Sequence, residues 1–212
     1  MPATLGFTPS IAVSADQKAE YLRFARSAAR AAGEAILPYF RSRLQVENKR
    51  EDGGFDPVTL ADQAGERVIR TAIEKDYPEH GIFGEEYGLM PGNGLTWVID
   101  PIDGTRAFMT GMLHWGVLLA LFDGEQPIVG VMYQPYTDEL FSGNNESAWF
   151  ERGGQSQPLV SSACERVDEA CLSTTGIGWL SASEQGRFKR LSQATKLTKM
   201  GGDCYLFGML AM

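Results

Sequence analysis

Two aspartates, Asp100 and Asp103, lie three positions apart directly after an apolar stretch of the chain. The stretch at 95–99 is rich in β-branched and large apolar residues and predicts a buried strand. Pro101 has no backbone N–H, so we expect the strand to end there. Gly104 permits a tight turn whose backbone N–H groups are able to face an anion. The pattern predicts paired carboxylates and an anion-binding turn at the end of one strand.

Clustered carboxylates repel one another, and burying them without a partner costs free energy. A cation relieves both costs, and oxygen ligands without Cys or His favour Mg²⁺ over zinc or copper. Because Mg²⁺ is commonly shared between carboxylates and substrate phosphates, the motif predicts metal-assisted phosphoryl chemistry. The alternative is a solvated Asp-Gly turn that only closes a strand. Glu85 and Glu86 upstream, and a Thr-x-x-Asp element ending at Asp62, favour the metal site over that alternative.

Two motifs carry a resemblance to a known family: Gly-Glu-Glu at 84–86 and Trp-Val-Ile-Asp-Pro-Ile-Asp-Gly-Thr-Arg-Ala-Phe at 97–108. Together they resemble the inositol monophosphatase family of Mg²⁺-dependent, lithium-sensitive phosphatases. Within that family, Gly-x-x-x-Trp-Gly at 111–116 and Gly-Gly-Asp-Cys-Tyr at 201–205 are most similar to the histidinol-phosphate phosphatases. The resemblance extends from about Ala19 to the last residue.

The resemblance implies a set of metal ligands. One Mg²⁺ ion is expected on Glu85, Asp100 and the backbone carbonyl of Ile102, and a second on Asp100 and Asp103. In the family an aspartate from a later acidic motif completes the second site, and nothing in this sequence matches that motif. Two or three ions and inhibition by Li⁺ are therefore expected by resemblance. In many relatives the corresponding preceding loop lies near the metals, where it can contribute to an additional metal site. Simple solvation is the alternative for its charged residues here, which remain unassigned: Lys49, Glu51 and Asp52.

The resemblance also implies roles for residues around the metals. Asp62, together with Thr105, would orient the attacking water and accept its proton. The N–H groups of Gly104 and Thr105 would hold phosphate oxygens. Asp203 matches an aspartate that lines the substrate pocket of histidinol-phosphate phosphatases, where a carboxylate can pair with the substrate amine. The alternative for Asp62 is a favourable charge in the first turn of a helix whose N-cap is Thr59, and the alternative for Asp203 is an ordinary helix-capping role.

We therefore expect a phosphate monoester hydrolase that acts on a small phosphorylated alcohol. Histidinol phosphate, an intermediate of histidine biosynthesis, is the first candidate. Inositol monophosphate, fructose bisphosphate and a nucleotide 3′-phosphate are alternatives with the same chemistry. A catalytically inactive metal- or phosphate-binding scaffold, or a chaperone-like partner, is an alternative of another class. The unmatched acidic motif favours the scaffold, whereas the intact residues of the first metal site disfavour it.

The composition is that of an ordinary globular protein, with 43% hydrophobic and 22% charged residues in a chain of 212. A net charge of −8 argues against a nucleic-acid partner, which requires clustered Lys and Arg. Cys164, Cys171 and Cys204 form no Cys-x-x-Cys pair and predict reduced thiols in a cytoplasmic protein. His80 and His114 are expected to be packing or surface histidines.

Two features of the sequence argue against a membrane protein. The N-terminus lacks a basic region followed by an apolar core, so we expect no signal peptide. The longest apolar run is too short to span a bilayer, so we expect no membrane partner. Because the family is commonly dimeric, the resemblance implies a homodimer.

The expected fold is α+β leading into α/β, the layered αβαβα sandwich of the inositol monophosphatase and fructose bisphosphatase type. A capping box at Ser14 and Gln17 predicts a helix that Pro38 kinks or ends. Strand-like runs between 115 and 150 predict an antiparallel sheet packed against this helix and a second one. We expect an N-terminal α+β metal-binding domain over 1–158 and a partial C-terminal α/β domain over 159–212. Because the sequence stops inside an expected helix without a C-cap, we expect the C-terminal part to be truncated.

Overall fold

The computed structural model describes residues 11–42, 46–48 and 57–212. The strands are β1 (Val46–Asn48), β2 (Pro57–Thr59), β3 (Gly81–Gly84), β4 (Gly88–Met90), β5 (Thr96–Asp103), β6 (Gly116–Phe122), β7 (Pro127–Gln134), β8 (Glu139–Asn144), β9 (Ala148–Arg152), β10 (Gln155–Pro158), β11 (Cys171–Thr174) and β12 (Leu197–Met200). The α-helices are α1 (Ala15–Ile36), α2 (Leu60–Asp76), α3 (Thr105–Met109), α4 (Ala182–Ala194) and α5 (Tyr205–Ala211).

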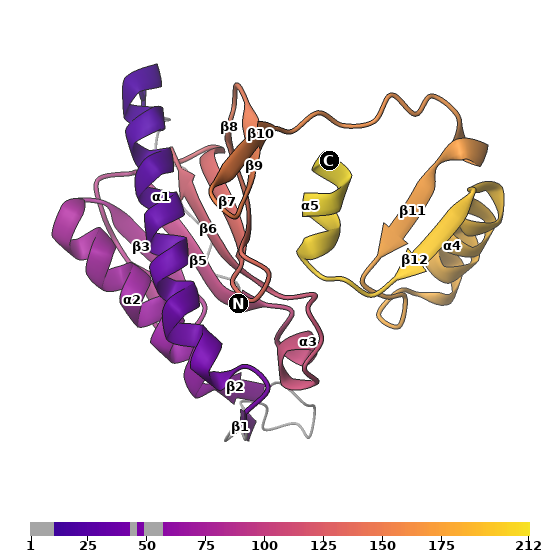
Figure 1. Cartoon of the computed structure of the whole chain (residues 1–212), viewed down its shortest axis with the longest axis horizontal. Coiled ribbons are helices and arrows are strands. Elements are labelled where there is room, and N and C mark those ends of the chain that lie inside the picture. The colour runs from indigo at the N-terminus through magenta and orange to yellow at the C-terminus, as the bar shows by residue number, and fades with distance from the viewer. Residues whose placement is uncertain (1–10, 43–45, 49–56) are drawn as a thin grey trace.

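A mixed sheet forms the centre of the molecule. Within the described residues it has eight strands, in the order β10-β9-β8-β7-β6-β5-β3-β4. Helices α1 and α2 lie side by side over one face of this sheet, and α5 lies on the other side (Figure 1). The predicted antiparallel sheet is confirmed in β6 to β9, whereas β3 and β5 pair in parallel. Sequence pattern alone did not predict β4 or β10, which are short and carry no apolar alternation.

Helix α1 begins and ends where the sequence predicts. The Ser14 hydroxyl accepts a hydrogen bond from the Gln17 N–H at 3.2 Å, and the Gln17 side chain accepts one from the Ser14 N–H at 2.9 Å. This reciprocal pair is the capping box. The α-helix ends at Ile36, and Pro38 lies in a 3₁₀ turn that follows.

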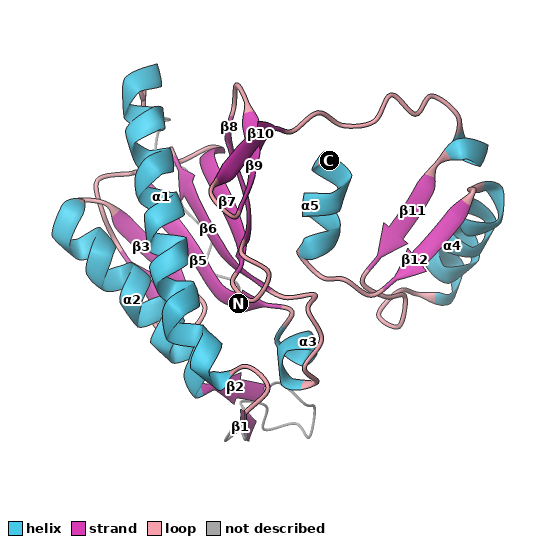
Figure 2. Ribbon diagram, viewed as in Figure 1, coloured by secondary structure: helices cyan, strands magenta, loops and turns pink. Residues whose placement is uncertain are grey.

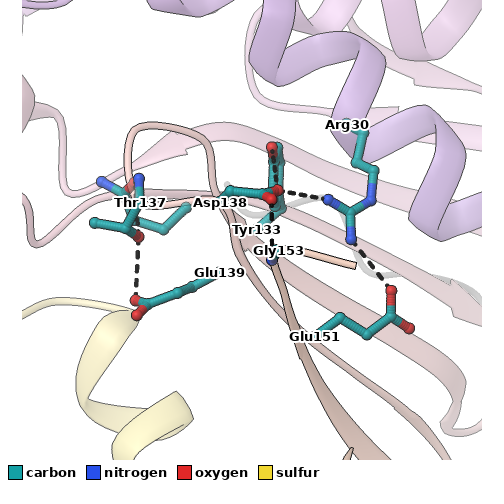
Figure 3. Close-up of polar contacts among 8 residues, drawn as sticks. Arg30, Tyr133, Thr137, Asp138, Glu139, Glu151 and Gly153 are labelled. Atoms are coloured by element: carbon teal, nitrogen blue, oxygen red, sulfur yellow. Dashed lines mark hydrogen bonds and ion pairs between the residues drawn. The ribbon is translucent and has the colours of Figure 1, made fainter. Parts of the chain in front are cut away.

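Close packing and ion pairs hold α1 on the sheet. A Cβ at Gly33 would lie 2.7 Å from the Tyr133 ring, so helix and sheet approach too closely there for a larger residue. Arg30 forms ion pairs with Asp138 at 2.7 Å and with Glu151 at 3.1 Å (Figure 3). Partly exposed pairs contribute about 1 kcal/mol or less each. Each large apolar side chain removed from water contributes roughly 1.5–3 kcal/mol. The ion pairs therefore orient α1, and apolar burial supplies most of its stability.

Strand β5 corrects one prediction. We expected the strand to end at Pro101, but β5 continues to Asp103. The pairing with β6 changes register between Asp100 and Asp103, so Pro101 lies inside a β-bulge. A bulge leaves one residue out of the ladder, and a missing N–H costs nothing at that position. The bulge, and not a strand end, gives the Asp-Pro-Ile-Asp segment its shape.

The chain after β10 forms a second, smaller layer. Residues 159–166 contain no helix or strand, and β11 and β12 then pair in parallel, with α4 between them in the sequence (Figure 2). Helix α4 has no buried residue, which contrasts with α1 and α2. The predicted domain boundary at 158/159 falls at the end of β10, and the division into two domains stays a prediction. Among the described segments, no helix combines the length and apolar character needed to cross a bilayer.

Candidate metal centre

Glu85 and Asp100 lie level with each other on two neighbouring strands, Glu85 directly after β3 and Asp100 within β5. Strands β3 and β5 are parallel, and Gly84 is the register partner of Ile99. Glu85 and Asp100 are the next residues of their respective chains, so both follow this pair at the same level. The structure thus brings together two carboxylates that are 15 positions apart in the sequence.

Helix α2 places Asp62 near Asp100. Asp62 lies in the first turn of α2 and is only 3% exposed. One turn later, a Cβ at Gly65 would lie 3.1 Å from Pro101 and 2.6 Å from Ile36. The glycine therefore lets α2 rest directly on the bulge of β5. Because residues three apart share a helix face, Asp62 lies on the side of α2 that packs against the bulge.

The turn after Asp103 depends on Gly104. This residue has φ of +86°, and a Cβ there would lie 2.5 Å from the His114 carbonyl oxygen. Both features exclude a side chain. The Thr105 hydroxyl donates a hydrogen bond to the Ile102 carbonyl at 3.1 Å, and α3 begins at Thr105. The predicted metal-binding carbonyl and the predicted water-binding hydroxyl are therefore direct neighbours.

Asp100 is the electrostatic centre of the group. Its Oδ1 atom is buried and has no hydrogen-bond partner among the described residues. Burial raises the pKa of Asp100 to about 8, with further contributions from the negative charges of Glu85, Asp103 and Asp62. A buried oxygen without a partner, surrounded by like charges, is costly unless it binds a proton or a cation. The residues therefore fit a hard divalent cation.

The carboxylates do not close into a finished ligand cage. Within the described ranges, no three His, Cys, Asp or Glu side chains converge closely enough to form a metal site by themselves. Without a bound cation, like-charged carboxylates repel one another, which keeps them apart. Mg²⁺ commonly keeps several waters and takes only one or two carboxylates, so it does not need a closed cage.

The segment before α5 reaches the site from the far end of the sequence. Asp103 accepts a hydrogen bond from the Cys204 N–H at 2.6 Å. Asp203 has φ of +42°, and burial together with the charge of Asp103 raises its pKa, while His114 and Arg106 act in the opposite direction. Asp203 thus lies near Asp103, and an ammonium group on a ligand would relieve the repulsion between these two aspartates.

Glu66 is a site residue that the sequence did not reveal. It is fully buried on α2 and accepts backbone N–H groups from the turn that carries Glu85. The available signal was its spacing, because Glu66 follows Asp62 by one helical turn. A charged residue at a buried helix position has a partner as a rule. His80, by contrast, is the packing histidine that we predicted, since it is buried and accepts the Trp97 indole N–H at 3.1 Å.

The three loop residues that remain without an assigned role lie outside the described residues: Lys49, Glu51 and Asp52. The other predicted site residues are all within the described chain and surround the end of β5: Asp62, Glu85, Asp100, Ile102, Asp103, Gly104, Thr105 and Asp203.

Comparison with known proteins identifies the family of the chain. The family model described as the inositol monophosphatase family matches residues 17–210. The chain belongs to the inositol monophosphatase family. Members of this family are generally metal-dependent, in keeping with the buried Asp100 oxygen that has no hydrogen-bond partner in the segments that the structure describes.

Two curated relatives from this family illustrate its range. A histidinol-phosphatase of Chlorobaculum parvum is 37% identical over 186 residues, which cover 87% of this chain and 70% of that protein. The bifunctional phosphatase IMPL2, chloroplastic, of Arabidopsis thaliana is 33% identical over 184 residues, which cover 85% of this chain and 51% of that protein. The chain therefore spans about half the length of the Arabidopsis relative.

Solved structures of the family have the same fold. An inositol monophosphatase from Zymomonas mobilis superposes with a TM-score of 0.77 at 34% identity, over 93% of this chain and 74% of that one. An IMPase from Thermotoga maritima gives a TM-score of 0.76 at 26% identity, over 91% and 72%. The predicted layered sandwich of the inositol monophosphatase type is thereby confirmed.

Proposed function

We propose that the chain acts as a Mg²⁺-dependent phosphate monoester hydrolase on a small phosphorylated alcohol, with histidinol phosphate as its substrate. The observation that carries the proposal is the Asp100 Oδ1 atom, which is buried, has no hydrogen-bond partner in the described part of the chain, and belongs to a carboxylate that feels the negative charges of three others. Histidinol phosphate is favoured because Asp203 can pair with an amine and because the Chlorobaculum relative is a histidinol-phosphatase.

The residues at the end of β5 would hold the metal. Glu85, Asp100 and the Ile102 carbonyl form the first set, and Asp100 and Asp103 contribute to a second. When bound, Mg²⁺ supplies Lewis acidity that polarises phosphate oxygens and lowers the pKa of water. All these donors are oxygen atoms, which Mg²⁺ prefers.

Asp62 and Thr105 would handle the attacking water. Asp62 is buried at the start of α2, and a carboxylate there can accept a proton from water. The Thr105 hydroxyl uses its hydrogen on the Ile102 carbonyl, so its lone pairs remain to accept a hydrogen from water. The N–H groups of Gly104 and Thr105 would hold the phosphate at the start of α3.

Phosphate release tests the proposal. L-histidinol phosphate and inositol 1-phosphate are each assayed with Mg²⁺ and with EDTA. We expect release that depends on Mg²⁺ and favours histidinol phosphate, and we expect Asp100→Asn to abolish it. A preference for the inositol ester would overturn the substrate but leave the reaction class standing. No release from either ester would favour the alternative of an inactive scaffold.

A homodimer is the assembly that we propose from family resemblance. Sedimentation velocity of the purified chain measures it directly, and a monomer over the whole concentration range would refute it.

A further inference from the structure

We propose that Glu66 is a positioning residue for the metal centre: its buried carboxylate fixes the turn that presents Glu85. The proposal rests on the proposed function only in taking Glu85 as a metal ligand. It concerns how this chain sets the affinity of the site, and it assigns a role to a carboxylate that does not itself touch the metal.

The carboxylate of Glu66 receives three hydrogen-bond donors. Its Oε2 accepts the Glu86 N–H at 2.7 Å, and its Oε1 accepts the Tyr87 N–H at 3.2 Å. The Arg70 Nε donates to Oε1 at 2.7 Å. The two backbone donors belong to the residues immediately after Glu85. Glu66 therefore holds the backbone of the Glu85 turn and not a side chain that could rotate away.

The strand before the turn is shaped around the same carboxylate. A Cβ at Gly84 would lie 1.8 Å from Glu66 Oε1, so only glycine allows the carboxylate to reach the turn. Gly84 is also the register partner of Ile99, which precedes Asp100. A movement of Glu66 would shift the exit of β3 relative to β5, and with it the separation of Glu85 from Asp100.

Arg70 holds the far side of the turn. Its guanidinium donates to the Gly88 carbonyl and lies over the Tyr87 ring at 5.8 Å from the centroid. The side chain of Glu66 is fully buried and that of Arg70 is 13% exposed, so the pair is shielded from solvent. The residues between β3 and β4 are thus anchored from one face of α2, the helix that also carries Asp62.

A merely structural role is the competing explanation, and Asp123 provides a matched control. Asp123 is also buried, and its Oδ1 accepts two turn N–H groups, from Glu125 at 2.9 Å and Gln126 at 3.0 Å. It follows β6 at Phe122, which pairs near Thr96 at the opposite end of β5 from Asp100. Loss of Asp123 would weaken the fold without disturbing the part of β5 that carries Asp100.

The test is metal binding by the full chain, read from the electron paramagnetic resonance signal of Mn²⁺, which takes the same oxygen ligands as Mg²⁺. Glu66→Gln is nearly isosteric but keeps one acceptor oxygen for three donors. We expect its Mn²⁺ Kd to rise about 10- to 100-fold, the usual cost of losing a group that orients a ligand. We expect Asp123→Ala to lower the melting temperature at least as much and to change Kd less than about twofold.

The outcomes separate the two proposals. An unchanged Kd in Glu66→Gln, or equal weakening in Asp123→Ala, overturns the positioning role while the proposed function stands. A wild-type chain that binds no Mn²⁺ or Mg²⁺ overturns the proposed function and the positioning role together. If circular dichroism shows that Glu66→Gln does not fold, Glu66→Asp decides the question. That variant keeps the charge but shortens the side chain by one methylene, which withdraws the carboxylate from the Glu86 and Tyr87 N–H groups, so a wild-type Kd in it would refute the proposal.

Discussion

Asp100 occupies a place in which an ordinary aspartate would not remain ionised. Burial and the nearby carboxylates raise its pKa to about 8, against about 3.9 in an unfolded chain. The folded chain therefore holds this proton more tightly than the unfolded chain does. The resulting stabilisation is complete below about pH 4 and is lost as the pH rises toward the folded-state value.

Replacing this carboxylate separates stability from metal binding. In EDTA, we expect Asp100→Asn to be more stable than the wild type at pH 9 by about 1–2 kcal/mol, because the amide cannot ionise. At pH 4 we expect little difference. Thermal denaturation at both pH values checks this, and added Mg²⁺ should raise the melting temperature of the wild type only.

Asp123→Asn is the control of opposite sign. Backbone hydrogen bonds from Gln126 and Glu125 lower the pKa of Asp123. Its contribution to stability is present above the unfolded-state pKa and lost on acidification, so the amide should destabilise the chain at pH 9. If Asp100→Asn and Asp123→Asn behaved alike, the inferred burial of a costly charge at Asp100 would be wrong.

At the scale of elements, α2 packs directly against Pro101, which lies between Asp100 and Asp103 on β5. Gly65 is the contact point, since a Cβ there would lie 2.6 Å from Ile36 and 3.1 Å from Pro101. Alanine gains about 0.5–1 kcal/mol in helix propensity, but overpacking costs about 1–3 kcal/mol. We expect Gly65→Ala to destabilise the chain by roughly 1 kcal/mol and to weaken Mg²⁺ binding, as measured by chemical denaturation and metal titration.

Gly186 in α4 offers the matched comparison. A Cβ there meets nothing closer than an Arg190 nitrogen at 3.9 Å. Gly186→Ala should therefore keep the propensity gain and stabilise the chain by about 0.5–1 kcal/mol without changing metal affinity. Destabilisation by both substitutions would show that close approach of α2 is not the cause.

The sequence predicted those elements whose signal is local. The capping box at Ser14 and the antiparallel strands between 115 and 150 follow from patterns of adjacent residues, and both are confirmed. The predicted strand end at Pro101 was wrong, because this residue lies in a β-bulge, where the ladder needs no N–H from it. Glu66 was missed because its partners are backbone groups on another element, and these have no signature in residue type.

The residues of the site were accessible to different degrees. Asp100, Asp103 and Gly104 form one motif, so their proximity follows from the chain itself. The approach of Asp203 could be expected only from family resemblance, because no local pattern connects it to Asp103. Such long-range contacts depend on tertiary packing, which a single sequence does not encode in a periodic form.

At the scale of the whole molecule, α5 connects the second layer to the large sheet. The Tyr205 hydroxyl donates to Glu139, which also accepts from Thr137 and pairs with Arg152 (Figure 3 shows the Thr137 contact). A Cβ at Gly208 would lie 3.1 Å from the Phe141 ring, so α5 packs closely on β8. These contacts hold Asp203 near Asp103.

Weaker packing of α5 should reduce substrate binding more than metal binding. We expect Tyr205→Phe to increase hydrogen exchange over 201–211 and to raise KM for histidinol phosphate several-fold, because about 1 kcal/mol of docking is lost. Metal affinity should stay within twofold. Tyr133→Phe, which removes a hydroxyl bonded to Asp138 away from α5, is the control and should leave exchange over 201–211 unchanged.

The positions of the acidic residues along the chain also order events during synthesis. Asp62, Glu85, Asp100 and Asp103 all lie between 62 and 103, whereas the Cys204 N–H that contacts Asp103 is 101 positions further on. Chains fold from the N-terminus as they emerge from the ribosome. These four carboxylates can therefore come together before the segment that contacts Asp103 has been translated. A cation captured by the nascent chain would offset the repulsion that otherwise opposes this early step.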